Sequence, residues 1–235
     1  MSLFSKLKTD NLENAEDRVG GGFKVLPTNI YNSKIKLAYA GTSASGAMNI
    51  TFICDIDGRE YKETIYITNK AGENFYKKND KKFPIPGFTL MNDICLLVTG
   101  NGLSEQDTAE KVVNVYSTDV KKEVPTKVQV LSDLIDEEIS LAIQHIVEDK
   151  NVKNASGEYV PSGETREINA ISKALQTSSK KTVIEITSNN DASFWDKWIE
   201  AHKDKVINKA KGAKTASSTA GEEAPTKPTR SLFKK

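Results

Sequence analysis

A lysine-rich stretch that also carries aromatic residues lies between residues 69 and 87. The segment from Asn69 to Phe83 interleaves Phe75, Tyr76 and Phe83 with five lysines: Lys70, Lys77, Lys78, Lys81 and Lys82. Lysines neutralise phosphates and aromatic rings stack on unpaired bases, so this mixture suits single-stranded nucleic acid. The alternative is a solvated loop whose aromatic rings pack into the core.

Four further polar residues precede this stretch on segments that alternate like strands: Lys34, Lys36, Lys62 and Tyr66. Small barrels of the oligonucleotide-binding type bind single strands across their second and third strands, and the loops beside those strands complete the groove. We therefore expect these four residues and the lysine-rich stretch to form one nucleic-acid surface. An ordinary solvent-exposed face is the competing interpretation.

Residues that could support catalysis or hold a metal are few. Asp133, Asp136, Glu137 and Glu138 cluster as magnesium ligands can, but they are neighbours in sequence and favour a solvated turn. There is no nucleophile elbow and no phosphate-binding loop. His145 and His202 are interpreted as packing residues. We expect no enzyme, no catalytic residue, no metal and no cofactor, and a metal-dependent nuclease is only a distant alternative.

The overall charge excludes a uniformly basic protein. The formal net charge of the 235 residues is +1, yet residues 131–175 carry −5, whereas residues 19–130, 176–211 and 212–235 are each net basic. Nucleic-acid binding must therefore depend on local charge.

The remaining composition places the chain in the cytoplasm. Cys54 and Cys95 are far apart and lie within apolar runs, which predicts reduced, buried thiols. The apolar runs are shorter than the roughly 18 residues of a membrane span, and the N-terminal residues lack the apolar core of a signal peptide. We expect a cytoplasmic protein with no membrane partner.

The strands are predicted first by alternation. Residues 34–39, 48–56 and 61–68 each place apolar side chains on one face, and Asp57-Gly58 is the turn expected between the second and third. Residues 69–87 are predicted to be a loop. A helix capped by Thr89 and ended by Gly100 should follow, then a fourth strand at residues 112–116 and a short segment at residues 127–131. Residues 139–147 fit either a strand or a helix.

The second half of the chain is less regular. Residues 151–181 are predicted to be a turn-rich excursion, and Thr182 to Thr187 a final strand. Residues 191–211 are predicted to form a C-terminal helix, capped by Asn190 or Asp191, on which Trp195 and Trp198 either pack on the body or mediate self-association. Residues 212–235 have the composition of a disordered tail.

Both termini carry the string Ser-Leu-Phe, at residues 2–4 and 231–233. An apolar pair near the end of a flexible tail is well suited to insertion into a partner's groove, so Leu232 and Phe233 are candidate partner-binding residues. Chance recurrence of a three-residue string explains the pattern equally well.

Several segments together resemble bacteriophage single-stranded DNA-binding proteins. The likeness covers about residues 20–190 and is carried by residues 36–47, 61–69, 86–88, 95–97, 123–128, 157–161 and 163–166. It implies an oligonucleotide-binding (OB-fold) β-barrel that coats single strands during phage DNA replication and recombination in the host cytoplasm. The family's acidic tail is absent here, because residues 212–235 are net basic.

These observations predict a mainly β protein with an internal helix. The expected order is an N-terminal arm (1–18), an OB-fold domain for single-stranded DNA (19–190) with an excursion near 151–181, a C-terminal helix (191–211) and a disordered tail (212–235). The expected function is sequence-independent binding of single-stranded DNA. The alternative is a replication scaffold whose helix and tail bind phage proteins such as a polymerase or helicase-primase.

Overall fold

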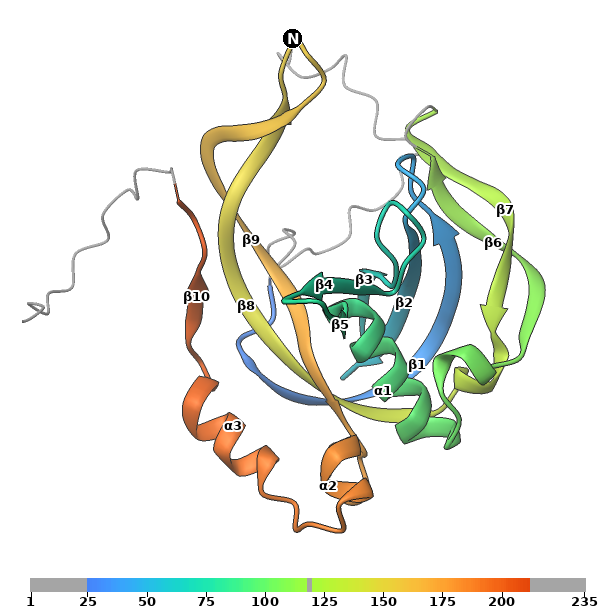
Figure 1. Ribbon diagram of the computed structural model, residues 1–235, viewed down its shortest axis with the longest axis vertical. Coiled ribbons are helices and arrows are strands. Elements are labelled where there is room, and N and C mark those ends of the chain that lie inside the picture. The colour runs from blue at the N-terminus through green and yellow to red at the C-terminus, as the bar shows by residue number, and fades with distance from the viewer. Residues whose placement is uncertain (1–24, 118–119, 212–235) are drawn as a thin grey trace, which may run out of the picture.

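The computed structural model describes residues 25–117 and 120–211 and is mainly β, as the alternating segments predict (Figure 1). Its strands are β1 (Asn29–Thr42), β2 (Met48–Ile56), β3 (Arg59–Tyr66), β4 (Phe75–Lys78), β5 (Lys81–Pro84), β6 (Thr108–Ser117), β7 (Lys122–Leu131), β8 (Glu138–Lys153), β9 (Tyr159–Leu175) and β10 (Val206–Asn208). Its α-helices are α1 (Pro86–Thr99), α2 (Val183–Thr187) and α3 (Phe194–His202).

One large sheet organises these strands, and β1 is its centre. Along the sheet the order is β10-β8-β1-β2-β3, with β9 paired to β8 and with β7 paired to both β1 and β6. The pairings are antiparallel except for that of β10 with β8, which is parallel. β4 and β5 form a separate two-stranded sheet.

The first three strands form the predicted meander. Along β2, Ile50, Phe52, Cys54 and Ile56 are buried, which is the period of two expected of a strand with one face in the core. Asp57 and Gly58 both have positive φ, 51° and 78°, as a type I′ turn requires. The meander and its turn are therefore confirmed.

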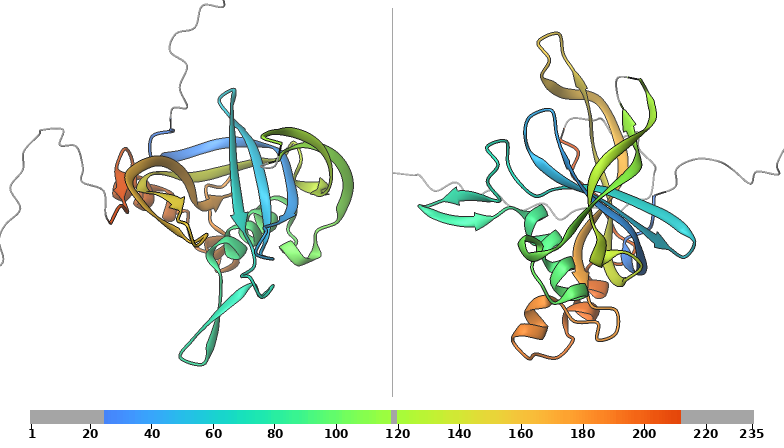
Figure 2. Two further views of the ribbon diagram at one scale, coloured as in Figure 1. Left: turned by 90° about the horizontal axis from the view of Figure 1, so that it is seen from above. Right: turned by 90° about the vertical axis from the view of Figure 1, so that its right-hand side faces the viewer.

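Residues 139–147 lie in a strand, β8, which resolves the choice that the sequence leaves open. β8 pairs with β9 along nearly its whole length, from Ser140↔Leu175 to Lys153↔Tyr159. The predicted excursion near 151–181 is thus mainly strand. Its tip, where β8 turns into β9, extends beyond the rest of the sheet (Figures 1 and 2).

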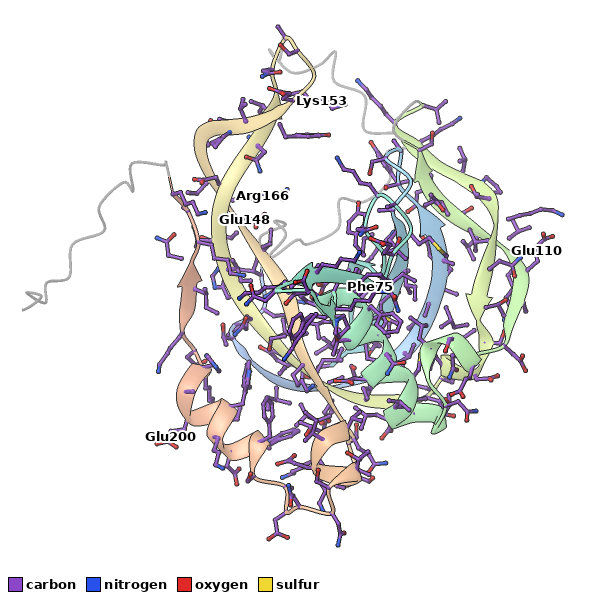
Figure 3. The ribbon with its side chains drawn as sticks, in the orientation of Figure 1. Phe75, Glu110, Glu148, Lys153, Arg166 and Glu200 are labelled. Carbon is purple, nitrogen blue, oxygen red and sulfur yellow. The ribbon has the colours of Figure 1, made fainter. Side chains whose placement is uncertain are left out.

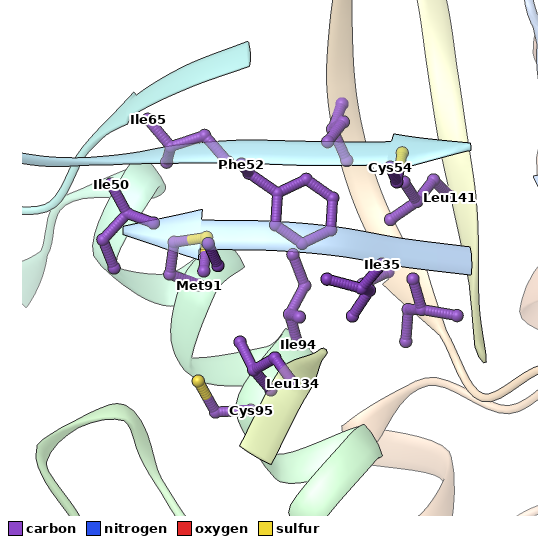
Figure 4. Close-up of a cluster of buried hydrophobic side chains, with 14 of the residues drawn as sticks. Ile35, Ile50, Phe52, Cys54, Ile65, Met91, Ile94, Cys95, Leu134 and Leu141 are labelled. Atoms are coloured by element: carbon purple, nitrogen blue, oxygen red, sulfur yellow. The ribbon is translucent and has the colours of Figure 1, made fainter. Parts of the chain in front are cut away.

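The core lies between the sheet and α1 (Figure 4). Phe52 and Ile35 of the sheet are fully buried and pack with Met91 and Ile94 of the helix. Both cysteines are free and buried, as predicted, and burial raises the pKa of each thiol to about 12. The two thiols therefore act as small core residues.

The helix α1 begins earlier than its predicted cap. Pro86 occupies the first turn, where its missing N–H leaves no hydrogen bond unmade, and the Thr89 hydroxyl donates to the Ile85 carbonyl oxygen instead of capping. The predicted end is confirmed, because Gly100 has a φ of 79° and its N–H donates to the Leu96 carbonyl oxygen.

The predicted final strand at residues 182–187 is wrong, because α2 occupies residues 183–187. Thr182 accepts a hydrogen bond from the Glu185 N–H, and the Glu185 carboxylate accepts one from the Thr182 N–H. This reciprocal capping box begins a helix in a stretch whose side chains also alternate. Ile184 and Ile186, which alternation would bury, are 65% and 42% exposed.

The predicted helix at 191–211 is also too long. It spans only 194–202, and Val206–Asn208 instead pairs with His145–Val147 of β8. Neither Asn190 nor Asp191 caps it. The buried Glu185 carboxylate accepts hydrogen bonds from the Ser193 and Phe194 N–H groups at the helix start.

The tryptophans of α3 pack on the body, in line with the first of the two roles considered for them. Trp198 is 6% exposed and lies in a small core with Ile30, Ala142 and Leu175. Trp195 is partly buried, with Lys180 Nζ 5.2 Å from its ring centroid. The predicted arm (1–18), the predicted tail (212–235), and with it Leu232 and Phe233, lie outside the described residues.

Among the glycines that the structure describes, Gly87 is predicted to be the least replaceable, because α1 starts against the backbone of β3. A Cβ at this position would overlap the Tyr66 carbonyl oxygen. We expect Gly87→Ala to lower the free energy of unfolding by at least about 2 kcal/mol, measured by urea denaturation. The control is Gly72→Ala, which has a φ of 80° but open space around it and should cost about 1 kcal/mol. Equal losses for the two variants would contradict the steric explanation.

Candidate nucleic-acid interface

The lysine-rich stretch folds as a hairpin that projects from the body, which corrects the predicted loop. β4 and β5 pair from Phe75↔Pro84 to Lys78↔Lys81 around a two-residue turn. The turn residues Asn79 and Asp80 both have positive φ, 50° and 58°, as in a type I′ turn. Both views of Figure 2 show this hairpin, hereafter the finger (residues 75–84), standing away from the large sheet.

One face of the finger carries an aromatic pair. Tyr76 and Phe83 stack with ring centroids 5.7 Å apart and are 48% and 39% exposed. Together with Lys78, Asn79 and Lys81 they surround a hollow of about 320 Å³. This face therefore offers ring surface and positive charge side by side.

The opposite face repeats the combination. Phe75 lies opposite Pro84, and the Lys82 ammonium sits 4.3 Å from the centroid of the Phe75 ring. Phe75 is labelled near the middle of Figure 3, where the finger lies in front of the sheet. Because side chains alternate across a strand, Lys77 and Lys82 share this face. Both faces of the finger thus pair lysines with an aromatic ring.

The four lysines of the finger have no carboxylate partner among the residues that the structure describes. Moreover, the register sets Lys77 opposite Lys82 and Lys78 opposite Lys81. Like charges directly opposite in an antiparallel pair destabilise it, by a few tenths to about 1 kcal/mol each. The finger therefore carries concentrated positive charge, with four lysines and one acidic residue, Asp80 in the turn.

Lys34 does not join this surface. Its ammonium is 3.1 Å from Asp136, and it lines a hollow with Asp55, Asp57 and Glu138. On β2, the partner of Lys34 is Asp55 and the partner of Tyr66 is Asn49. These two partners are six residues apart along the strand, so Lys34 lies about 20 Å from the Tyr66 end of the sheet.

The other sequence-predicted residues are all exposed but occupy different places. Tyr66, 50% exposed, is the last residue of β3, and eight residues separate it from the finger. Lys70 lies in the turn between β3 and β4. Lys62 lines a hollow of about 220 Å³ farther along β3, and Lys36 sits at an irregularity in the pairing of β1 with β2. The structure thus places Tyr66 beside the start of α1, where the chain returns from the finger, while Lys62 and Lys36 lie farther away on the body.

Sequence reasoning missed a second exposed aromatic with a lysine over it, at the tip of the β8–β9 hairpin. Tyr159 is 68% exposed, and Lys153 Nζ lies 5.5 Å from its ring centroid. Farther down the same hairpin, the Arg166 guanidinium binds the Glu148 carboxylate, 2.7 Å away (Figure 3). A Lys and a Tyr six residues apart become visible as a pair only once the hairpin register is known.

Glu63 links two strands that are not paired with each other. Its Oε2 accepts hydrogen bonds from the Tyr61 hydroxyl on the same strand, 2.6 Å away, and from the Ile171 N–H of β9, 2.9 Å away. Burial raises the pKa of Glu63, although these two hydrogen bonds favour the charged form. Sequence reasoning missed Glu63 because the residues on either side of it, Lys62 and Thr64, are polar and typical of a solvent-exposed segment.

The acidic cluster of residues 133–138 lies where the chain passes from β7 to β8. In the described ranges no three His, Cys, Asp or Glu side chains come together as metal ligands. Asp136 pairs with Lys34 instead. His145 lies 3.1 Å from Glu167, and His202 packs against the Trp198 ring.

No helix in the described part of the chain is long and apolar enough to cross a membrane.

Comparison of the chain with known proteins identified no related protein. No family model matches the chain, and neither the curated proteins nor the solved structures contain a match.

The raised pKa of Glu63 predicts how stability depends on pH. The folded state keeps a proton that the unfolded state releases near pH 4.5, so protonated Glu63 stabilises the fold at low pH, and this contribution is lost as the pH rises through the folded pKa. We expect the difference in unfolding free energy between wild type and Glu63→Gln to fall as the pH is raised from 4 to 8. Urea denaturation of both proteins measures it.

The control for this prediction is Glu60→Gln, which removes an exposed carboxylate from the same strand and leaves the bond to Ile171 in place. It separates the effect of Glu63 from a general loss of negative charge on β3. A wild-type–Glu63→Gln difference that is constant across this pH range would contradict the assignment.

Proposed function

We propose that this protein binds single-stranded DNA without sequence-dependent selection of its sites and without catalysis. The observation that carries the proposal is the finger, in which the exposed Tyr76–Phe83 pair stands among four lysines that have no acidic partner in the described part of the chain. Unpaired bases expose their faces to stacking, and each lysine placed against a phosphate releases a counterion.

The geometry of the finger favours a single strand over a duplex. Its aromatic rings lie on both faces of a narrow hairpin, where bases splayed from a flexible strand reach them. Stacked bases in a duplex do not expose their faces, so a duplex would contact only the lysines. Single strands should therefore gain stacking energy that double strands do not.

The arrangement of the sheet supports a further part of the proposal, an open barrel of the oligonucleotide-binding class. Strands β3-β2-β1-β8-β9 are consecutive neighbours, and Glu63 connects the two outer strands. The resemblance of residues 20–190 to phage proteins supports a role in coating exposed strands during phage DNA replication and recombination in the host cytoplasm.

Removing the charge of the finger tests the electrostatic part. We expect replacement of Lys77, Lys78, Lys81 and Lys82 together by alanine to weaken binding to a dT oligonucleotide and to reduce the slope of log K against log salt concentration by up to about 3, since each phosphate contact contributes about 0.7. Fluorescence anisotropy across a series of salt concentrations measures both quantities.

The matched control replaces four exposed lysines elsewhere: Lys180, Lys197, Lys203 and Lys205. It removes the same charge and should change the slope far less. If both quadruple variants alter binding equally, the finger is not the binding element. If wild type shows no preference for single strands over duplex, the proposed function is wrong.

Removing the rings tests the stacking part. We expect Tyr76→Ala and Phe83→Ala each to weaken single-strand binding by about 1–3 kcal/mol while the salt slope stays unchanged, because stacking involves no counterion release. Tyr116→Ala on β6, which removes another ring that is 56% exposed, is the control. A loss that is equally large for Tyr116→Ala would contradict the assignment to the finger.

A further inference from the structure

A hollow of about 440 Å³ lies where the finger joins the body. Tyr66, the last residue of β3, and Pro86, the first helical residue after the finger, both line the hollow. Its volume falls in the range of small-molecule sites, about 300–1,000 Å³. A strand bound along the finger would therefore pass its entrance.

Several polar side chains that line this hollow have unused hydrogen-bonding capacity. Within the described residues, Glu63 Oε1, the Gln144 side-chain amide and the Lys209 ammonium make no hydrogen bond or ion pair. They come from three different strands or strand ends: β3, β8 and the residue after β10. Convergent polar groups without partners are what a site for a polar ligand presents.

The Glu63 carboxylate is held in place by its other oxygen. Oε2 accepts hydrogen bonds from the Tyr61 hydroxyl and from the Ile171 N–H of β9, which orient the carboxyl group in the lining of the hollow and leave Oε1 without a partner among the described residues. Above its raised pKa the Glu63 carboxyl is ionised, and an ionised carboxylate oxygen only accepts hydrogen bonds. The hollow therefore selects a ligand with a donor at this point.

The rest of the lining suits a flat ring. Ile65, Ile146 and Ile171 are each less than 10% exposed and supply an apolar floor, while the half-exposed ring of Tyr66 stands at the side. Lys209 is exposed, which places a positive charge within reach of a backbone phosphate. A nucleotide combines all three features: a flat ring, polar edges and a phosphate.

Among the four bases, guanine best matches an acceptor-only oxygen. Its Watson–Crick edge presents two adjacent donors, N1–H and the N2 amino group, and its O6 lies next to them for an amide donor such as that of Gln144. Adenine and cytosine place a ring acceptor beside their amino group, and thymine flanks its single N–H with two carbonyl oxygens, so each would set a lone pair against the carboxylate.

We propose that this hollow is a base subsite that takes one base of the bound strand and prefers guanine. The inference rests on the proposed function and refines it: most of the strand is held without regard to sequence by the finger, and one position is selective. Glu63 accepts from the guanine edge, Gln144 donates to O6 and Lys209 contacts a neighbouring phosphate.

Short dT oligonucleotides with one central dG, dA, dC or dI test the subsite by fluorescence anisotropy. We expect the dG strand to bind at least about fivefold more tightly than the dA, dC and all-dT strands. The dI strand should fall between them, because inosine keeps N1–H and O6 but lacks the N2 amino group.

Variants assign the preference to the hollow. Glu63→Gln keeps an oxygen to accept from Ile171 but replaces the acceptor-only group, so the dG preference should fall below about twofold. Gln144→Ala should reduce the preference for the dG strand in part. If Glu63→Gln does not fold, Gln144→Ala is the variant that tests the subsite. Glu60→Gln, a glutamate on the same strand that does not line this hollow, is the control and should keep the preference.

The outcomes separate the two proposals. Equal affinity of wild type for all these strands, with single-strand binding intact, would overturn the guanine subsite and leave the proposed function standing. A dG preference that survives in both Glu63→Gln and Gln144→Ala would also overturn it, since the selective position would then lie elsewhere. Absence of binding to every strand would overturn the proposed function and the subsite together.

Discussion

The structure depends on how it closes the seam between β3 and β9, two outer strands that face each other without pairing. Each unpaired strand edge exposes backbone groups that are costly to bury unsatisfied. The Glu63 carboxylate satisfies one of them by accepting from the Ile171 N–H, and α1 packs against both strands. The helix is tied to β9 by Asp93, 2.6 Å from Lys173, and fits against β3 because Gly87 has no side chain.

This closure also positions the surface that we assign to nucleic acid. Because α1 is fixed by the seam, the finger that leads into it leaves the body at a defined place beside Tyr66. The finger itself is poorly stabilised, since a two-stranded hairpin is marginal in water and its lysines face each other in like-charged pairs. Natural proteins accept like-charged residues that destabilise a local element at sites where those charges bind a ligand.

Much of the fold could be predicted from local patterns, whereas the candidate site could be predicted only in composition. The alternation of β2, the turn at Asp57-Gly58 and the end of α1 at Gly100 depend on neighbours in sequence, and these predictions are confirmed. The lysines and aromatic rings of residues 75–83 lie on one hairpin, but which of them face each other across its two strands depends on a register that composition does not reveal. Lys34 shows the limit: its charge suggested a phosphate contact, while its real neighbours are acidic residues.

The sequence by itself determined the elements whose cause is local: strands with one apolar face, the tight turn at Asp57-Gly58 and the end of the helix at Gly100. Only the tertiary structure decided the elements whose cause is distant. Val206–Asn208 carries apolar residues at helical spacing with α3, yet it is a strand because the backbone of His145–Val147 lies beside it. The link from Glu63 to Ile171 joins residues 108 apart, and a hydrogen bond across that separation exists only after folding brings both strand edges together.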